Sequence, residues 1–330
     1  MTGEGRATTP VRLRGYRQGD EETVFALWQI SLPMDTIDRA LFITRIMLDV
    51  NFEKDGFIVA EAGPDVVGFI YAAVRGTPLY QDDFQREEGW ASVFFVHPAW
   101  RRQGIGTALV RAAMAYVRSR GRPVLAISPY APSYFWPGPD LERHAAAVAL
   151  LETLGGATRE EPVAMDARLV GFTVPDDVLR LRHQRATEGY MIGALETRYI
   201  ADLLAFLYTH FGADWGRAVR EALLRAISYE QILIVRHSEQ IVGFCLSGGY
   251  DHVAERFGPF GVHPQRRGLG LGKLLLYDCL ARMRGRGLHN AYFMWTGDDD
   301  PAGHLYRRAG FQVTRRFRVV SLTCPDGPVS

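Results

Sequence analysis

An internal repeat constrains this 330-residue chain more than any other feature of its sequence. The stretch VHPAWRRQGIG at residues 96–106 aligns with VHPQRRGLGLG at residues 262–272. Upstream, VVGFI at residues 66–70 aligns with IVGFC at residues 241–245. The separation is 166 residues in one block and 175 in the other, so the first copy has a loop about nine residues longer. Several matches in the same order indicate a duplicated fold.

The same succession of elements is expected around each repeat. A strand comes first, an amphipathic helix closed by a glycine follows, and a second strand comes next. In the two copies these runs cover residues 90–96 and 257–262, then 107–118 and 273–284, then 123–128 and 290–295. This order predicts an α+β (α/β) fold, with two tandem domains that each hold a mixed, mostly antiparallel sheet flanked by helices.

The repeat also sets the expected boundaries. We expect an N-terminal domain over residues 10–172, a linker helix over residues 173–188 and a C-terminal domain over residues 189–323. The length agrees with two domains. Pro175 is suited to the first turn of the linker helix.

Composition excludes several classes of function. The net charge of +1 provides no field that would attract nucleic acid or a membrane surface, and no apolar run has the length of a membrane span. Cys245, Cys279 and Cys324 form neither a disulfide framework nor a zinc spacing, and the first two are expected to be buried thiols. A cytoplasmic location is expected, and the sequence does not indicate an oligomeric state.

Each repeat contains Arg-x-x-Gly-x-Gly between a strand and a helix, at residues 101–106 and 267–272. Glycine lets a ligand approach the backbone, and the N–H groups at the start of a helix attract anions. One such turn is often ordinary turn chemistry, but two copies behind the same Val-His-Pro segment favour a phosphate site. The spacing differs from the dinucleotide fingerprint and from the phosphate loop of nucleotide hydrolases, which argues against a nucleotide-binding protein of another class.

With these motifs the chain resembles the GNAT superfamily of N-acetyltransferases, once in each half, and in particular tandem members such as mycothiol synthase. The resemblance implies that acetyl-CoA binds along the strand before the turn, with its pyrophosphate on the turn and CoA as product. In the second half the implied binding residues are Phe260, Gly261, Val262, Arg267, Gly268, Leu269, Gly270, Leu271, Gly272 and Lys273. In the first half they are Phe95, Val96, Arg101, Arg102, Gln103, Gly104, Ile105, Gly106 and Thr107.

The two halves differ in a candidate general acid. The resemblance implies that Tyr306, followed by Gly310 and Phe311, protonates the departing thiolate; a buried core aromatic is the alternative. Leu151 takes this position in the first half and cannot donate a proton. We therefore expect the second half to be catalytic and the first not. The first half instead has an aromatic loop over residues 134–140, either a rigid turn or a lid.

The general base is less well defined by the sequence. Glu255 is the preferred candidate and His252 the second, with solvated loop charges as the alternative. The acidic run at residues 298–300 contains a helix cap at Asp300 and also suits attraction of a cationic amine. His97 and His263 are expected to be structural.

The expected reaction is transfer of an acetyl group from acetyl-CoA to a primary amine of a small molecule or peptide. A non-catalytic acyl-CoA sensor on the same fold is the alternative. The helices near residues 20–50 and 198–227 are expected to shape the acceptor pocket, but the sequence does not identify the acceptor.

Overall fold

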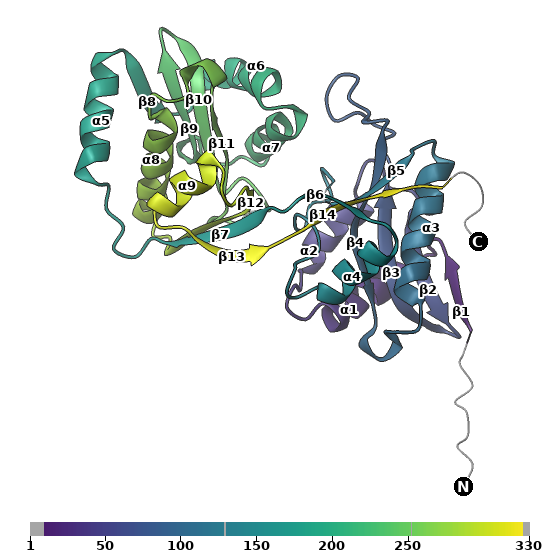
Figure 1. The fold of residues 1–330 in the computed structure, drawn as a ribbon. Helices are drawn as coiled ribbons and strands as arrows, with labels where there is room; N and C mark the ends of the chain where they lie inside the picture. The colour runs from purple at the N-terminus through teal and green to yellow at the C-terminus, as the bar shows by residue number, and fades with distance from the viewer. Residues whose placement is uncertain (1–9, 129, 252, 326–330) are drawn as a thin grey trace. The chain divides into compact units, whose positions relative to one another are not determined.

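A computed structural model describes residues 10–128, 130–251 and 253–325 (Figure 1). The chain forms two compact units. The first contains Met1–Pro78, Phe84–Glu161 and Arg316–Ser330, and the second contains Leu79–Asp83 and Pro162–Arg315. The prediction of an α/β fold with mostly antiparallel sheets flanked by helices is confirmed in both halves, although the strands of the second half are divided between two sheets.

The first unit is built on a seven-stranded sheet with the order β1-β2-β3-β4-β5-β14-β6. Its strands are β1 Val11–Arg14, β2 Phe57–Ala62, β3 Asp65–Ala73, β4 Glu88–Val96, β5 Val124–Ile127, β14 Val319–Thr323 and β6 Ala157–Glu160. The β4–β5 pair is parallel, and the other pairs are antiparallel.

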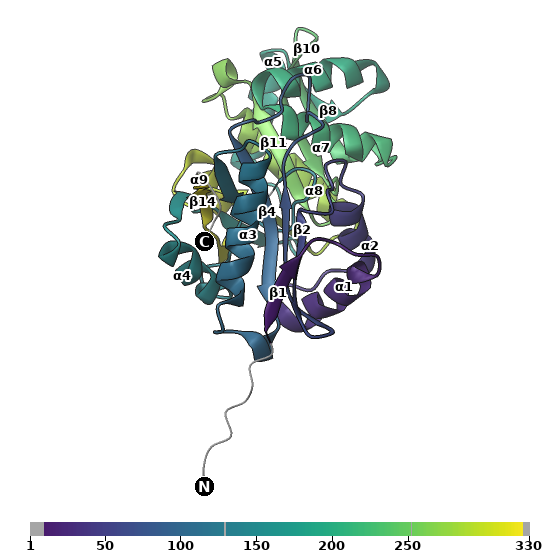
Figure 2. The same ribbon diagram turned by 90° about the vertical axis from the view of Figure 1, so that its right-hand side faces the viewer.

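Helices cover both faces of this sheet (Figure 2). They are α1 Asp20–Ser31, α2 Arg39–Phe42, a π-helical turn at Ile43–Met47, a 3-10 turn at Pro98–Trp100, α3 Ile105–Ser119 and α4 Ala145–Thr153. On α3 the residues Leu109, Ala113 and Val117 recur every four positions and are buried against one face. On the other face Trp28 of α1 is fully buried beside Phe42.

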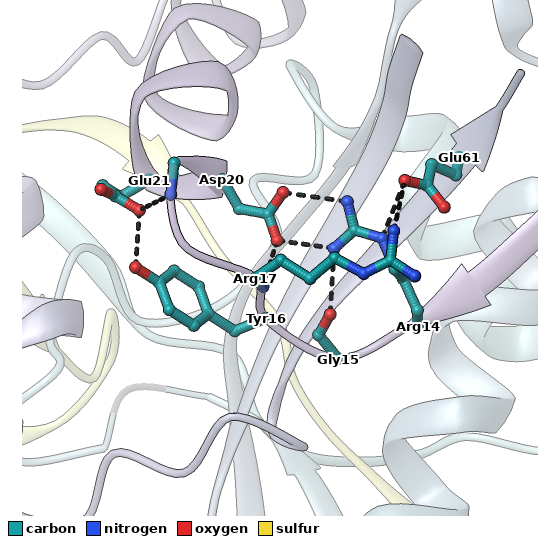
Figure 3. A network of polar contacts seen from close by, with 8 residues as sticks. Arg14, Gly15, Tyr16, Arg17, Asp20, Glu21 and Glu61 are labelled. Atoms are coloured by element: carbon teal, nitrogen blue, oxygen red, sulfur yellow. Dashed lines mark hydrogen bonds and ion pairs between the residues drawn. The ribbon is translucent and has the colours of Figure 1, made fainter. Parts of the chain in front are cut away.

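A polar network joins β1 to the start of α1 (Figure 3). Arg14 donates from both terminal nitrogens to Asp20, at 2.6 and 2.9 Å, and its Nε lies 2.8 Å from Glu61 Oε1. The backbone N–H of Arg17 also donates to Asp20 Oδ2 at 2.6 Å. Burial alone would raise the pKa of Asp20, but these hydrogen bonds outweigh it and lower the pKa.

The second unit repeats these elements with its strands divided between two sheets, ordered β11-β10-β9-β8 and β12-β7-β13. Its strands are β7 Val163–Arg168, β8 Tyr190–Ala194, β9 Ile232–His237, β10 Gln240–Ser247, β11 Phe257–Val262, β12 Asn290–Thr296 and β13 Gln312–Arg316. Its helices are α5 Asp176–Thr187, α6 Ile200–His210, α7 Ala213–Leu224, α8 Leu271–Gly285 and α9 Pro301–Arg308, with 3-10 turns at Thr197–Tyr199, Tyr229–Gln231 and Pro264–Arg266. Cys245 and Cys279 are buried in its core, as expected.

The two copies exchange their last strands. β14, at the end of the chain, lies between β5 and β6 of the first unit, while β7 lies between β12 and β13 of the second (Figure 1). The compact units therefore depart from the repeat boundaries at residues 172 and 323, because each repeat supplies one strand to the other unit. An alternating pattern predicts that a strand is half-buried but does not identify the sheet that it joins.

Two further segments differ from the expected organisation. The predicted linker helix is helical, but α5 belongs to the second unit and packs against α8. The longer loop of the first repeat supplies Leu79–Asp83 to the second unit, where the Tyr80 ring stacks on Tyr208 with centroids 3.7 Å apart. Among the described residues, no helix is long and apolar enough to cross a membrane.

Candidate functional site

In the first unit β4 and β5 separate at the point where the sequence predicts a ligand. Their parallel pairing runs from Glu88 opposite Val124 to Ala91 opposite Ile127, and β4 then continues to Val96 paired only with β3. The register between β3 and β4 shifts at Ser92, which marks a bulge in β4. The separation leaves one edge of β4 available beyond the bulge.

The glycine-rich turn of the first unit is open around its cap glycine. Gly104 is the N-cap of α3, with φ of 81°, and a Cβ placed on it would meet no atom within 4 Å. Arg102 also adopts a left-handed conformation, with φ of 64°. Arg101 donates to the carbonyl oxygens of Val96, at 3.1 Å, and of Ser31, at 2.8 Å, so it ties α1 to β4.

A cavity of about 830 Å³ adjoins this turn and the exposed edge of β4. Ala91–Val96, the turn residues Arg101, Arg102, Gly104, Gly106 and Thr107, and the α4 residues Ala146, Ala147, Ala149, Leu150 and Thr153 line it, together with loop residues from 31–35 and 136–144. Five of the implied first-half residues in the turn and both implied residues of β4, Phe95 and Val96, therefore line one cavity. Gln103 and Ile105 are not among its lining residues; Ile105 is buried in the core.

The aromatic loop of the first half packs on the core and also lines the cavity. Phe135 is buried against Trp28, with ring centroids 4.9 Å apart, so the loop packs on the core. Trp136, Gly138 and Pro139 also line the cavity. The loop between β5 and α4 is longer than its counterpart in the second half, and this extra length forms one wall of the cavity.

A polar cluster lies at the same wall. Asp35, in the loop between α1 and α2, is 3.1 Å from His144 Nε2 and 3.3 Å from an Arg143 nitrogen. His144 Nδ1 accepts the backbone N–H of Asp140, which leaves Nε2 as the donor to Asp35. The Asp35 carboxylate is only 6% exposed but lines the cavity. No motif in the sequence indicates this cluster; its only sign there is the long segment between β5 and α4.

In the second unit the corresponding strands, β11 and β12, also separate, but aromatic rings surround the space between them. β11 and β12 meet at one bridge, Arg256 to Tyr292. Tyr306 of α9 is 7% exposed, and its ring centroid lies 4.2 Å from that of Phe293, 5.4 Å from Phe311 and 5.6 Å from Phe260. Burial raises the pKa of Tyr306 well above its ordinary value, so its hydroxyl stays protonated.

The repeat alignment shows why the first unit is more open at this point. Phe257, Phe293, Tyr306 and Phe311 of the second unit correspond to Ala91, Ile127, Leu151 and Gly156 of the first. Each of these aromatic residues has a smaller residue at the corresponding position of the first unit. The second unit fills the space between its separated strands with rings, whereas the first leaves a cavity there.

Helix α5 lies against the glycine-rich turn of the second unit. Asp177, Leu181 and Arg185, spaced four residues apart on one face of α5, contact Lys273, Gly270 and the carbonyl oxygen of Leu269 in turn. A Cβ on Gly270 would lie 2.7 Å from Leu181 Cδ2. The Asp177 carboxylate already pairs with Lys273, the side chain that was expected to bind the pyrophosphate.

The remaining second-half residues lie near the turn or on β11. Phe260, Gly261 and Val262 are on β11, and a Cβ on Gly261 would meet the Phe211 ring at 2.4 Å. Gly272 would accept a Cβ at ordinary contact distances. Arg267 and Gly268 are exposed at the turn, and Leu271 is buried as the first residue of α8.

Glu255 and His252 are the candidate bases of the second half, and residues 298–300 form its acidic run. Glu255 is half-buried, and its carbonyl oxygen accepts the N–H of Tyr292 at 3.0 Å; His252 lies outside the described residues. Asp300 caps α9 by accepting the N–H of Gly303 at 2.6 Å, and Asp298 pairs with Arg307.

The two repeat histidines have the structural role expected of them. His97 and His263 each accept a backbone N–H two residues ahead through Nδ1, at 3.2 Å. Each imidazole thereby caps the 3-10 turn that precedes its glycine-rich segment.

Comparison with known proteins agrees with this duplicated architecture. Residues 23–130 match the acetyltransferase (GNAT) family and residues 228–313 match an acetyltransferase (GNAT) domain, so the two matches span more than half of the chain. The mycothiol acetyltransferase of Saccharomonospora viridis is 28% identical over 87% of this chain and 95% of its own length. That of an Arthrobacter species is 28% identical over 66% of this chain and 65% of its own.

Solved structures show the same fold. A tandem GNAT protein from the clavulanic acid biosynthesis pathway superposes with a TM-score of 0.63 and 16% identity, over 97% of this chain and all of its own. An N-acetyltransferase from Sphaerobacter thermophilus gives 0.67 and 18%, over 96% and 97%. A glucosamine N-acetyltransferase region of a fungal multi-domain β-N-acetylglucosaminidase gives 0.80 and 18%, over 97% of this chain and 39% of that longer one. The chain belongs to the GNAT family of acetyl-CoA-dependent N-acetyltransferases and carries two copies of the domain in tandem.

Proposed function

We propose that this acetyltransferase binds acetyl-CoA in the cavity of its first unit and transfers the acetyl group to a primary amine of a small molecule. The observation that carries the proposal is that the cavity joins the open turn at Gly104 to the free edge of β4. The turn and the N-terminus of α3 suit the pyrophosphate. The β4 backbone beyond Ala91 suits the amide groups of the pantetheine arm, because its N–H and C=O groups are not used by β5.

The reaction needs an unprotonated amine and a thiolate that can leave. The amine nitrogen forms a bond to the acetyl carbon, the carbon–sulfur bond breaks, and the proton released by the amine balances the thiolate. Asp35 lines the cavity, where its carboxylate is already paired with Arg143 and His144, so an ammonium group of the acceptor would have to share or displace these partners. We assign to it the binding of the acceptor's ammonium group. The relatives named mycothiol acetyltransferase make an acceptor used in mycothiol formation the first to test.

The second unit remains a candidate for the chemical step because Tyr306 lies between its separated strands, beside Phe260 of β11. In that case Tyr306 would protonate the thiolate and Glu255 would accept the amine proton through water. Leu151 provides no such acid in the first unit. There the donor and acceptor would react through proximity alone.

A matched pair of glycine variants tests where the donor binds. A Cβ on Gly106 would lie 2.9 Å from Leu150 Cδ1, a residue of the cavity wall, whereas one on Gly272 would make ordinary contacts. We expect Gly106→Val to weaken acetyl-CoA binding at least tenfold in calorimetry, and Gly272→Val to change it less than twofold. The reverse pattern would place the donor in the second unit.

A further inference from the structure

The first unit's cavity is polar at one end and apolar at the other. Its outer part includes Arg101, Arg102 and Thr107 at the start of α3. Its inner part lies where β4 and β5 separate and is lined by Ala91, Val93 and Ile127, all buried. Charged phosphates suit the outer end, and the inner end suits an apolar group.

Ser92 and Ser128 line the cavity near its inner end, and each has an interaction within the protein. The hydroxyl of Ser92 is 2.9 Å from the hydroxyl of Ser133, so the two groups share one hydrogen bond. A cationic amine placed among Ala91, Val93 and Ile127 would lose its hydration without a counter-charge. The acceptor is better served by Asp35, on the loop between α1 and α2.

Resting on the donor site proposed above, we propose that this apolar end holds an acyl chain longer than acetyl, such as butyryl. The acyl group is the apolar end of an acyl-CoA molecule whose phosphates lie at the turn. The pantetheine arm, if it runs from the turn along β4, extends from Val96 toward Ala91. The chain beyond the thioester then enters the space between the separated strands.

The second unit shows how the same fold closes this space. At the positions of Ala91 and Ile127 it has Phe257 and Phe293, whose ring centroids lie 6.2 Å apart. An acyl chain longer than acetyl would have to displace these rings. The smaller pair in the first unit is therefore the feature that permits a longer chain.

The transfer balances as it does for acetyl. The amine nitrogen bonds to the acyl carbon, the carbon–sulfur bond breaks, and the thiolate takes up one proton equivalent from the amine. No oxidant, reductant or further reactant is required. The product is a longer amide and free CoA.

Calorimetry with the full chain and the series CoA, acetyl-CoA and butyryl-CoA tests the proposal. Each methylene that moves from water into an apolar site raises affinity about fourfold, so butyryl-CoA, with two more methylenes, should bind roughly fifteenfold more tightly than acetyl-CoA. Ile127→Phe, which copies the second unit, should reverse that preference, as should the milder Ala91→Val. Phe293→Leu in the second unit is the matched control and should leave the preference as it is.

The outcomes separate this proposal from the donor-site proposal. If butyryl-CoA binds the unaltered chain no more tightly than acetyl-CoA, while Gly106→Val abolishes acetyl-CoA binding, the donor site stands and the longer acyl chain is refuted. If Gly106→Val leaves acetyl-CoA binding intact, the donor site itself is refuted. A change of preference with Phe293→Leu but not with Ile127→Phe would also overturn the assignment, because it would move the acyl pocket to the second unit.

Discussion

Replacing Tyr306 with phenylalanine distinguishes the two units as the place of acetyl transfer. The substitution keeps the ring, and with it the contacts to Phe260, Phe293 and Phe311 at centroid distances of 5.6, 4.2 and 5.4 Å. It removes only a buried hydroxyl. Loss of one such group changes stability by about 1 kcal/mol, so the variant should fold normally.

The kinetic expectation follows from the first-unit proposal. If transfer takes place in the first unit, Tyr306→Phe should change kcat less than twofold. If Tyr306 is the general acid, kcat should fall by about 10²- to 10⁴-fold, equal to roughly 3–5 kcal/mol of barrier. Because burial keeps the pKa of Tyr306 well above 10, its loss should not alter the pH profile near neutrality in either case.

The assay is release of CoA thiol from acetyl-CoA in the presence of a panel of amines, with acetyl-CoA affinity measured in parallel. Tyr116→Phe serves as the control, since it removes another buried hydroxyl, from α3. A hundredfold fall in kcat for Tyr306→Phe alone, with acetyl-CoA affinity preserved, would refute transfer in the first unit. It would also support the sequence-based role of Tyr306.

Three further predictions concern the exchanged strands, the β1–α1 network and the acceptor. Leu322→Ala in β14 should destabilise the first unit by about 2–5 kcal/mol, and Met165→Ala in β7 should destabilise the second by a similar amount, because both side chains are fully buried. Amide hydrogen exchange should rise in those units; a rise in the unit formed mainly by the strand's own repeat would contradict the strand swap. At pH values above 3.8, the ordinary pKa of an aspartate, Asp20→Asn should lower the free energy of unfolding measured in urea by about 1.5–3 kcal/mol. Since folding lowers the pKa of Asp20, that difference should shrink as pH falls from 3.8 through the folded pKa, and a constant difference would refute the linkage. Asp35→Asn should raise KM for a cationic amine about tenfold without weakening acetyl-CoA binding, and an unchanged KM would exclude its role.

The sequence predicts the elements of this fold well because they depend on local patterns. The helix expected over residues 107–118 is α3, Ile105–Ser119, and that expected over 273–284 is α8, Leu271–Gly285. Glycine punctuation and apolar spacing are sufficient for such elements. The partners of β7 and β14 could not be predicted in this way, because both strands are compatible with either half of a duplicated sheet.

The candidate site was only partly accessible from sequence, for a related reason. Motifs identify the turn residues Arg101–Thr107 because a phosphate requires particular backbone geometry there. Asp35 has no motif, since it meets His144 only through the folding of two loops that are far apart in sequence. The contact between α5 and Gly270 was likewise invisible, because a helix pattern does not specify which surface the helix covers.

Duplication explains why the clearest motifs and the clearest cavity occur in different halves. A duplicated domain retains its turn in both copies, because the glycines and the helix start are also needed for the strand-to-helix connection. Side chains between the separated strands are free to diverge, and here one copy has Phe257, Phe293 and Tyr306 where the other has Ala91, Ile127 and Leu151. Rings improve packing and make a stable core. Small residues give up that packing and leave a cavity whose inner end is apolar and lies where the strands separate. A ligand that occupies this cavity would replace the contacts that the small side chains give up, which is the physical reason for placing the acyl donor in the first unit.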